Sequence, residues 1–282
     1  MSVKIIVDST ADLSSRIADK VSIVPLTIRF GDKEFVDGVD IDRKKFYEML
    51  IESDVMPSTS QANIDDFDRI FEKIEKNGDT AVVITLSSKL SGTYNSARIA
   101  AEDHKGKIFV VDSLSVAIGT GILAEVATEL AEDGCTAEYI ADYLESERER
   151  VKVIAMFDTL EYLKRGGRIS AAAAIAGGML SLKPVITVRN GEVAILGKAR
   201  GSKQGNNLLA REIESAGGVD FNKPLLLGYT GLSDLLLQKY VEDSAYLWQD
   251  RRSKLEFTLI GSVVGTHAGP GAIAVAFFRK DS

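Results

Sequence analysis

Three short segments rich in Gly, Ser and Thr hold the residues best suited to chemistry in this chain. They are 57–61 (PSTSQ), 87–97 (SSKLSGTYNSA) and 264–272 (VGTHAGPGA). Each is expected where a strand or loop meets a helix or a tight turn. Together they supply hydroxyl groups, backbone N–H groups and one of the two histidines. These groups suit the binding of a small anion such as a carboxylate or phosphate. Because the sequence shows no convincing set of nucleophile, base and acid, it favours binding over catalysis.

The segment 87–97 follows an apolar run at 80–87 that is typical of a buried strand. Ser91 is expected to be the N-cap of the next helix, so that Gly92 and the first helical turn present their amides to an outside acceptor. The helix dipole there favours negative charge. An ordinary capped helix without a ligand explains the same residues.

The other two segments hold further hydroxyls and an imidazole. Thr59 and Ser60 either cap the following helix or face a ligand, and a plain interhelical loop is the alternative. His267 is expected in a Gly-Pro-Gly turn with no helical or strand face to pack on. It then either caps the turn, donates a hydrogen bond to an anion or relays a proton. His104 lies in a charged helix end and is expected on the solvated surface.

Two arginines and one alanine-rich segment extend this picture. The two glycines before Arg168 are expected to end a helix, and Arg168 itself is placed to bridge two domains or to orient an anion site. Arg200 is either an exposed surface charge or a contact to a partner protein or phosphate. The segment 170–182 is expected to be a helix that packs closely on a sheet or lines an apolar slot.

The composition of the chain argues against several classes of function and of stabilising site. The formal charge of −7 argues against a nucleic-acid-binding surface. The single cysteine, Cys135, excludes an internal disulfide, and two histidines with one cysteine cannot form a typical zinc site. Neither a signal peptide nor a run of 18 apolar residues is found, so we expect a cytoplasmic protein without a membrane span.

The order of the elements predicts an α/β chain with two domains. In residues 1–155, buried strands alternate with helices, which predicts a doubly wound, mostly parallel sheet. In residues 156–282, strands and helices are expected to form an α+β domain with antiparallel pairing. It includes a hairpin around Asn190-Gly191 and a long helix at 233–249.

Taken in chain order, several motifs resemble those of the DegV family. They are the opening VDSTADL, PSTSQ, SSKLSGTYNSA, EYLKRGGRIS, KPVITV and VGTHAGPG, and they span nearly the whole chain. The resemblance implies two α/β domains that bury a long-chain fatty acid, such as palmitate or stearate, between them. It also implies a binding subunit without a catalytic centre, which presents the acid to a separate ATP-dependent fatty acid kinase. No cofactor or metal is implied.

The resemblance also assigns roles to individual residues. Thr59 and Ser91 match hydroxyls that hold the carboxylate, with the Gly92 amide beside them. His267 matches a histidine close to the head group. Arg168 matches an arginine that supports this network, and Arg200 matches one near the surface that faces the kinase. Ser60 is grouped with the fatty-acid-binding residues.

Two other functions stay open at this point. The first is an autonomous acyl hydrolase or transferase with His267 as the base and Ser91 or Thr59 as the nucleophile. The chain has no GxSxG motif, no evident acid to orient His267 and no Walker-type loop for ATP. The second is a regulatory protein that senses a lipid.

Overall fold

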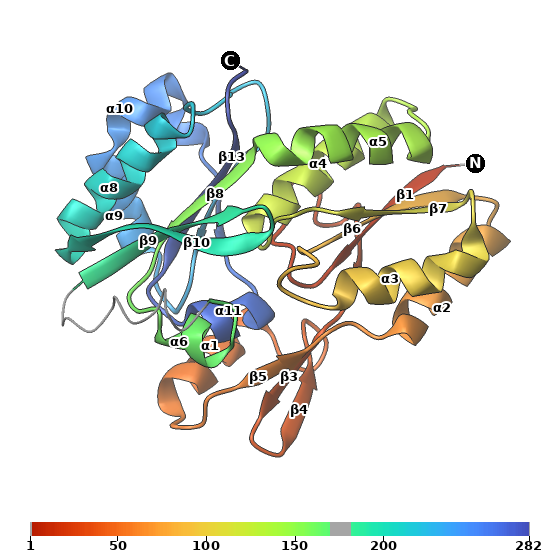
Figure 1. The fold of residues 1–282 in the computed structure, drawn as a ribbon, viewed down its shortest axis with the longest axis horizontal. Coiled ribbons are helices and arrows are strands. Elements are labelled where there is room, and N and C mark those ends of the chain that lie inside the picture. The colour runs from red at the N-terminus through yellow and green to blue at the C-terminus, as the bar shows by residue number, and fades with distance from the viewer. Residues whose placement is uncertain (1, 170–181, 282) are drawn as a thin grey trace.

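The chain folds around two β-sheets with helices on their outer faces and one helix between them (Figure 1). The computed structural model describes residues 2–169 and 182–281. The predicted fold class is confirmed: the N-terminal part has a parallel sheet and the C-terminal part a mostly antiparallel one.

The first sheet has the strand order β2-β1-β6-β7, and every pairing in it is parallel. The strands are β1 (Val3–Asp8), β2 (Ser22–Val24), β6 (Thr80–Thr85) and β7 (Ile108–Asp112). Side chains alternate between the two faces of the strands. Ile6 and Val83 pack in one core with residues of α1 (Arg43–Glu52), α2 (Ile64–Lys76) and α3 (Thr93–Ala101).

The second sheet has the strand order β10-β9-β8-β13-β11-β12. Its pairings are antiparallel except that of β11 with β12. Its strands are β8 (Val151–Met156), β9 (Leu182–Arg189), β10 (Glu192–Arg200), β11 (Leu225–Tyr229), β12 (Phe257–Leu259) and β13 (Ile273–Phe278). The outer face is covered by α8 (Gly201–Ser215), α9 (Leu235–Asp243) and α10 (Ala245–Trp248). The predicted hairpin at Asn190-Gly191 is confirmed, and both residues have positive φ angles.

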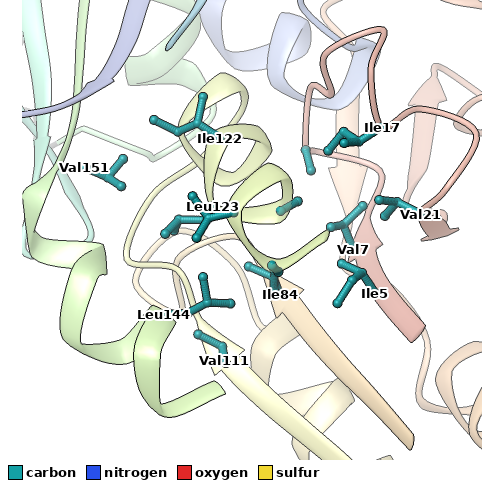
Figure 2. Packing of buried hydrophobic residues seen from close by; sticks show 14 of the residues in the cluster. Ile5, Val7, Ile17, Val21, Ile84, Val111, Ile122, Leu123, Leu144 and Val151 are labelled. Carbon is teal, nitrogen blue, oxygen red and sulfur yellow. The ribbon is translucent and has the colours of Figure 1, made fainter. Parts of the chain in front are cut away.

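Helix α4 (Ile118–Glu132) lies between the two sheets and joins their cores. In one continuous cluster, its residues Ile122 and Leu123 meet Val7 and Ile84 of the first sheet and Val151 of the second (Figure 2). Helix α5 (Ala137–Glu147) adds Leu144 to the same cluster. Because this core is shared, α4 fixes how the two sheets face each other.

A third, small sheet has the order β4-β3-β5 and lies below the main sheets in Figure 1. It consists of β3 (Thr27–Phe30), β4 (Lys33–Val36) and β5 (Ser58–Ser60). The expectation of a plain interhelical loop at PSTSQ is therefore wrong, because Ser58–Ser60 pairs antiparallel with β3. Helix α2 begins after Asn63, so neither Thr59 nor Ser60 caps it.

Two other local predictions are corrected by the structure. His267 lies in a helix, α11 (Ser262–Ala268), which ends at Gly269 with φ 71°, and not in an open turn. The long helix expected at 233–249 is interrupted at Ser244, which separates α9 from α10. The alanine-rich helix expected at 170–182 falls almost entirely on residues outside those that the structure describes.

Strand β8 bears on where the chain divides. The predicted domains meet between residues 155 and 156, but β8 pairs along its length with β13 and also with β9. These pairings make β8 part of the second sheet. In the described ranges, no helix is long and apolar enough to cross a membrane.

Candidate functional site

A cavity lies between the carboxyl ends of the first-sheet strands, one face of the second sheet, and helices α6 (Glu161–Arg165) and α11. Thr10 and Leu86 reach it from just beyond β1 and β6, at the edge where parallel α/β sheets bind ligands. Val153 and Ala155 reach it from alternate positions of β8, so the second sheet contributes one of its two faces.

The interior of the cavity is apolar. Its walls are formed by aliphatic and aromatic side chains from both halves of the chain, including Leu26, Leu90, Val116, Phe157, Leu163, Ile186, Val188, Val193, Ile260, Val263, Ile273 and Ala274. The space open to the centre of a water molecule is about 120 Å³. A single buried water needs only about 10–15 Å³ and two or more polar partners. An apolar space of this size suits a hydrocarbon chain better than ordered water.

Five polar or charged side chains form one part of the cavity wall. Thr59, Ser60 and Ser91 line the cavity together with Arg168 and His267. Ser60 is exposed and Thr59, Ser91 and Arg168 are half-buried, so this part of the wall lies near the surface. We call the part of the cavity wall formed by these five residues the mouth. Most of the other described residues that line the cavity are apolar, and a wall with both parts suits an amphiphile with an acidic head.

The imidazole of His267 and the hydroxyl of Thr59 are in direct contact. The distance from His267 Nε2 to Thr59 Oγ1 is 2.9 Å, within hydrogen-bonding range. Thr59 comes from β5 and His267 from the last turn of α11. The sequence predicted both residues for the site but gave no reason for them to touch, because two unrelated elements bring them together.

The start of α11 is held by residues of the N-terminal half. The hydroxyl of Tyr47 donates to Ile260 O (3.0 Å), and Asp12 Oδ1 accepts from Gly261 N (2.8 Å). Arg43 forms an ion pair with Asp12 (3.0 Å). Burial raises the pKa of the Asp12 carboxyl to about 6, although Arg43 and the Gly261 amide act in the opposite direction. These contacts fix the helix that carries His267.

Ser91 lies two residues before the first residue of α3. The N-cap position belongs to Gly92, which corrects the expectation of Ser91 as the N-cap. Ser91 Oγ nevertheless accepts a hydrogen bond from Thr93 N (3.2 Å) and lies 2.9 Å from Thr93 Oγ1. Gln61 packs against Gly92 so closely that a Cβ at position 92 would overlap its Oε1 atom. The amide end of Gln61 therefore packs directly on the backbone at the start of α3.

Arg168 joins two of the loops around the mouth. Its Nε donates to Leu90 O (3.2 Å) and its Nη1 donates to Gly166 O (2.6 Å). The first bond reaches the loop of Ser91, and the second holds the turn after α6. A guanidinium has five N–H donors, so these two bonds do not exhaust its capacity. Arg168 supports the mouth and places a positive charge beside it.

The electrostatics of the mouth keep His267 neutral near pH 7. Burial lowers the pKa of the His267 imidazole to about 4, and the nearby Arg168 guanidinium adds to the effect. Both causes disfavour a second positive charge. A bound anion would remove part of this penalty, since it would offset the charge of Arg168.

The structure thus brings together five of the seven residues singled out from the sequence: Thr59, Ser60, Ser91, Arg168 and His267. Among the described residues that line the cavity, Gly92 and Arg200 are absent. Arg200 is exposed, ends β10 and precedes α8. Sequence reasoning missed Gln61, which lines the mouth and donates from Nε2 to Ser96 Oγ (2.9 Å). The only feature of the sequence that pointed to Gln61 was its position in the segment PSTSQ.

The second histidine lies elsewhere and corrects a prediction. His104 is buried, at 6% exposure, and not on the solvated surface. Its Nε2 lies 3.1 Å from Asp68 Oδ1 and its Nδ1 lies 2.9 Å from Glu75 Oε2. Although burial favours the neutral ring, the two carboxylates outweigh it and raise the pKa of His104. This residue links α2 to the end of α3 and takes no part in the site.

Comparisons with known proteins find similar sequences over nearly the whole chain. A family model described as "Uncharacterised protein, DegV family" matches residues 2–280. A DegV domain-containing protein of Caldanaerobacter subterraneus subsp. tengcongensis is 36% identical over 287 residues, which cover 99% of each chain.

Two solved structures are similar over nearly the whole chain. One, a DegV family protein from Thermus thermophilus that is described as binding fatty acid, has a TM-score of 0.86 at 29% identity. It covers 99% of this chain and 100% of that one. The other, a stearic-acid-binding protein from Eubacterium ventriosum, has a TM-score of 0.83 at 27% identity. It covers 99% of this chain and 98% of that one.

Proposed function

The chain belongs to the DegV family, and we propose that it binds one long-chain fatty acid, such as palmitate or stearate, in the cavity between its two sheets. The acyl chain occupies the apolar interior, and the carboxylate lies at the mouth among Thr59, Ser91 and His267. The observation that carries this proposal is a cavity whose described lining is mostly apolar and also holds the hydroxyls of Thr59 and Ser91 and the imidazole of His267. Similar proteins described as binding fatty acids support it.

The energetics favour a ligand held mainly by its tail. Burial of about 15 methylene groups at about 0.8 kcal/mol each gives on the order of 12 kcal/mol before the costs of association. The carboxylate loses water when it enters the mouth, so its hydrogen bonds offset that loss and add little net affinity. The head group therefore sets the orientation of the ligand.

A hydrolase at this site is disfavoured by the surroundings of His267. The pair of His267 and Thr59 has the distance of a base and a nucleophile. However, among the described residues no group accepts a hydrogen bond from His267 Nδ1, so no acid orients the ring as in a triad. The lowered pKa makes the imidazole a weak base at neutral pH. Absence of p-nitrophenyl palmitate hydrolysis by the pure protein would agree with a binding role.

The finer part of the proposal concerns a partner. We infer that the protein presents the bound acid to a separate fatty acid kinase, with the carboxylate at the surface end of the cavity. The exposure of Ser60 at the mouth supports access from outside. Arg200, exposed at the junction of β10 and α8, is the residue proposed to contact the kinase.

The test uses protein freed of lipid and three ligands with the same tail. Palmitate, palmityl alcohol and methyl palmitate are each titrated against a bound fluorescent fatty acid. The proposal expects all three to compete, because the tail that they share supplies most of the affinity. Failure of all three ligands to compete would contradict the proposal.

A further inference from the structure

We propose that Gly166 is a positioning residue that holds His267 in the tautomer protonated on Nε2, so that the Thr59 hydroxyl donates its own proton to a bound anion. This inference rests on the proposed function, since it takes that anion to be the carboxylate of a fatty acid. It assigns a role to a glycine whose sequence context indicated only the end of a helix.

The backbone at Gly166 does not itself require a glycine. Gly166 is the C-cap of α6, with φ −71° and ψ −9°, which lies in the right-handed helical region that residues other than glycine readily adopt. The next residue, Gly167, has φ 70° and is the one that turns the chain out of the helix. A Cβ at Gly167 would meet nothing within 4 Å. The two neighbouring glycines therefore have different reasons to be glycine.

The reason at Gly166 is contact with His267. A Cβ at position 166 would overlap the Nδ1 atom of His267 and lie 2.8 Å from its Cε1. It would also lie 3.2 Å from Tyr162 O, the carbonyl that accepts a hydrogen bond from Gly166 N. Any side chain at 166 would therefore push the imidazole ring away from its present position against Thr59.

With the ring in this position, the hydrogen-bond partners of its two nitrogens determine where the proton of the neutral ring resides. His267 Nδ1 is buried and has no hydrogen-bond partner among the described residues. A proton on Nδ1 would be a buried donor without an acceptor, which folded proteins avoid. On Nε2 the proton has an acceptor, because Thr59 Oγ1 lies 2.9 Å away. The geometry therefore favours Nε2–H, which donates to Thr59.

The tautomer then decides what Thr59 can do. If Nε2–H donates to the Thr59 oxygen, the hydroxyl proton of Thr59 is left for another acceptor, and Thr59 lines the cavity. A carboxylate only accepts hydrogen bonds, so it needs this donor. In the opposite tautomer, Nε2 would accept the Thr59 proton, and the hydroxyl could not donate to the ligand.

The first experiment reads the tautomer directly in the lipid-free protein. Long-range ¹H–¹⁵N correlation spectra of ¹⁵N-histidine-labelled protein at pH 7 distinguish protonated from unprotonated ring nitrogens. His104→Gln identifies which signals belong to His267, since the chain has two histidines. Nε2 of His267 is expected to carry the proton. A proton on Nδ1 would overturn the inference.

The second experiment is a double-mutant cycle on palmitate affinity. Gly166→Ala is expected to weaken binding by ~10-fold, because Thr59 loses its orienting partner. In a His267→Ala background, the same substitution should have less than about a twofold effect, since the ring that it displaces is absent. Gly167→Asn, which preserves the left-handed turn, is the control and should bind normally.

An equal loss of palmitate affinity on Gly166→Ala in the unaltered protein and in the His267→Ala variant would show that Gly166 acts through the fold and not through His267. If Gly166→Ala does not fold, the spectrum of the unaltered protein still decides the tautomer. If the unaltered protein does not bind palmitate, the proposed function fails. The tautomer of His267 is then still read from the spectrum of the unaltered protein.

Discussion

The Nε2 atom of His267 lies 2.9 Å from the Oγ1 atom of Thr59, although 208 positions separate the two residues in the sequence. Thr59 belongs to the small sheet of the N-terminal half and His267 to a helix of the C-terminal half. The mouth of the cavity is therefore completed only when the two halves are assembled. Ligand binding and the docking of the halves should stabilise each other.

Removal of the Thr59 hydroxyl tests its role in binding. Thr59→Ala is expected to weaken fatty acid binding by about 1–3 kcal/mol, because the carboxylate and His267 both lose a partner. The measurement is displacement of a fluorescent fatty acid. Ser58→Ala is the matched control, since Ser58 is an exposed residue of the same strand and is not among the described residues that line the cavity. Equal affinities for the two variants would remove Thr59 from the site.

The protonation of His267 gives a second test. In the lipid-free protein its pKa is about 4, lowered by burial and then by Arg168. A bound carboxylate is expected to raise this pKa, because an opposite charge stabilises the imidazolium. An NMR titration of the free and palmitate-bound protein measures both values. An unchanged pKa in the complex would place the carboxylate away from His267.

The same shift predicts how stability depends on pH. The folded-state pKa of about 4 lies below the ordinary value of about 6.5. The neutral ring thus stabilises the fold above about pH 6.5, and this contribution is lost as the pH falls toward 4. The free energy of unfolding of His267→Gln should decline less over this range than that of the unaltered protein.

His104 should behave in the opposite way. Its pKa is raised by Asp68 and Glu75 against the effect of burial. Its contribution to stability is therefore complete below about pH 6.5 and is lost as the pH rises through the folded-state pKa. Urea unfolding of the unaltered protein and His104→Gln at pH 6 and pH 8.5 measures this. A stability difference that does not shrink at the higher pH would contradict the prediction.

A larger side chain in the apolar wall should change which ligands fit. Ala155 and Ala274 are paired neighbours on β8 and β13, and both line the cavity. Ala274→Leu is expected to reduce palmitate affinity by ~10-fold or more and to spare a shorter acid such as decanoate, because the added atoms occupy tail space. An unchanged preference in a folded variant would show that the tail does not pass Ala274.

Arg200 offers a test of the partner. Arg200→Ala should leave palmitate affinity unchanged and lower the rate at which a fatty acid kinase phosphorylates the bound acid. Arg211→Ala is the control, since Arg211 is an exposed arginine of the adjacent helix α8. Equal phosphorylation rates for both variants and the unaltered protein would remove Arg200 from the proposed contact.

Features with local causes were predictable from the sequence. Alternating apolar strands and helices predicted the parallel sheet, and the turn chemistry of Asn190-Gly191 predicted the hairpin, because each depends on residues close in sequence. The residues of the mouth were predicted from their chemical types and from the family resemblance, and five of them line one cavity.

Features with distant causes were not predictable in this way. Ser58–Ser60 becomes a strand because β3 pairs with it. His104 is buried because α2 supplies two carboxylates to it. Gly166 is explained by the ring of His267, about one hundred residues further along the chain. Each depends on tertiary contacts that local propensity does not contain.

The most direct test of the account is the mass of the native protein. Electrospray mass spectrometry under non-denaturing conditions, after incubation with palmitate or stearate, should show the chain with one added fatty acid. The added mass should disappear on denaturation. A chain that keeps its bare mass under native conditions with either acid would contradict the claim that the cavity binds a fatty acid.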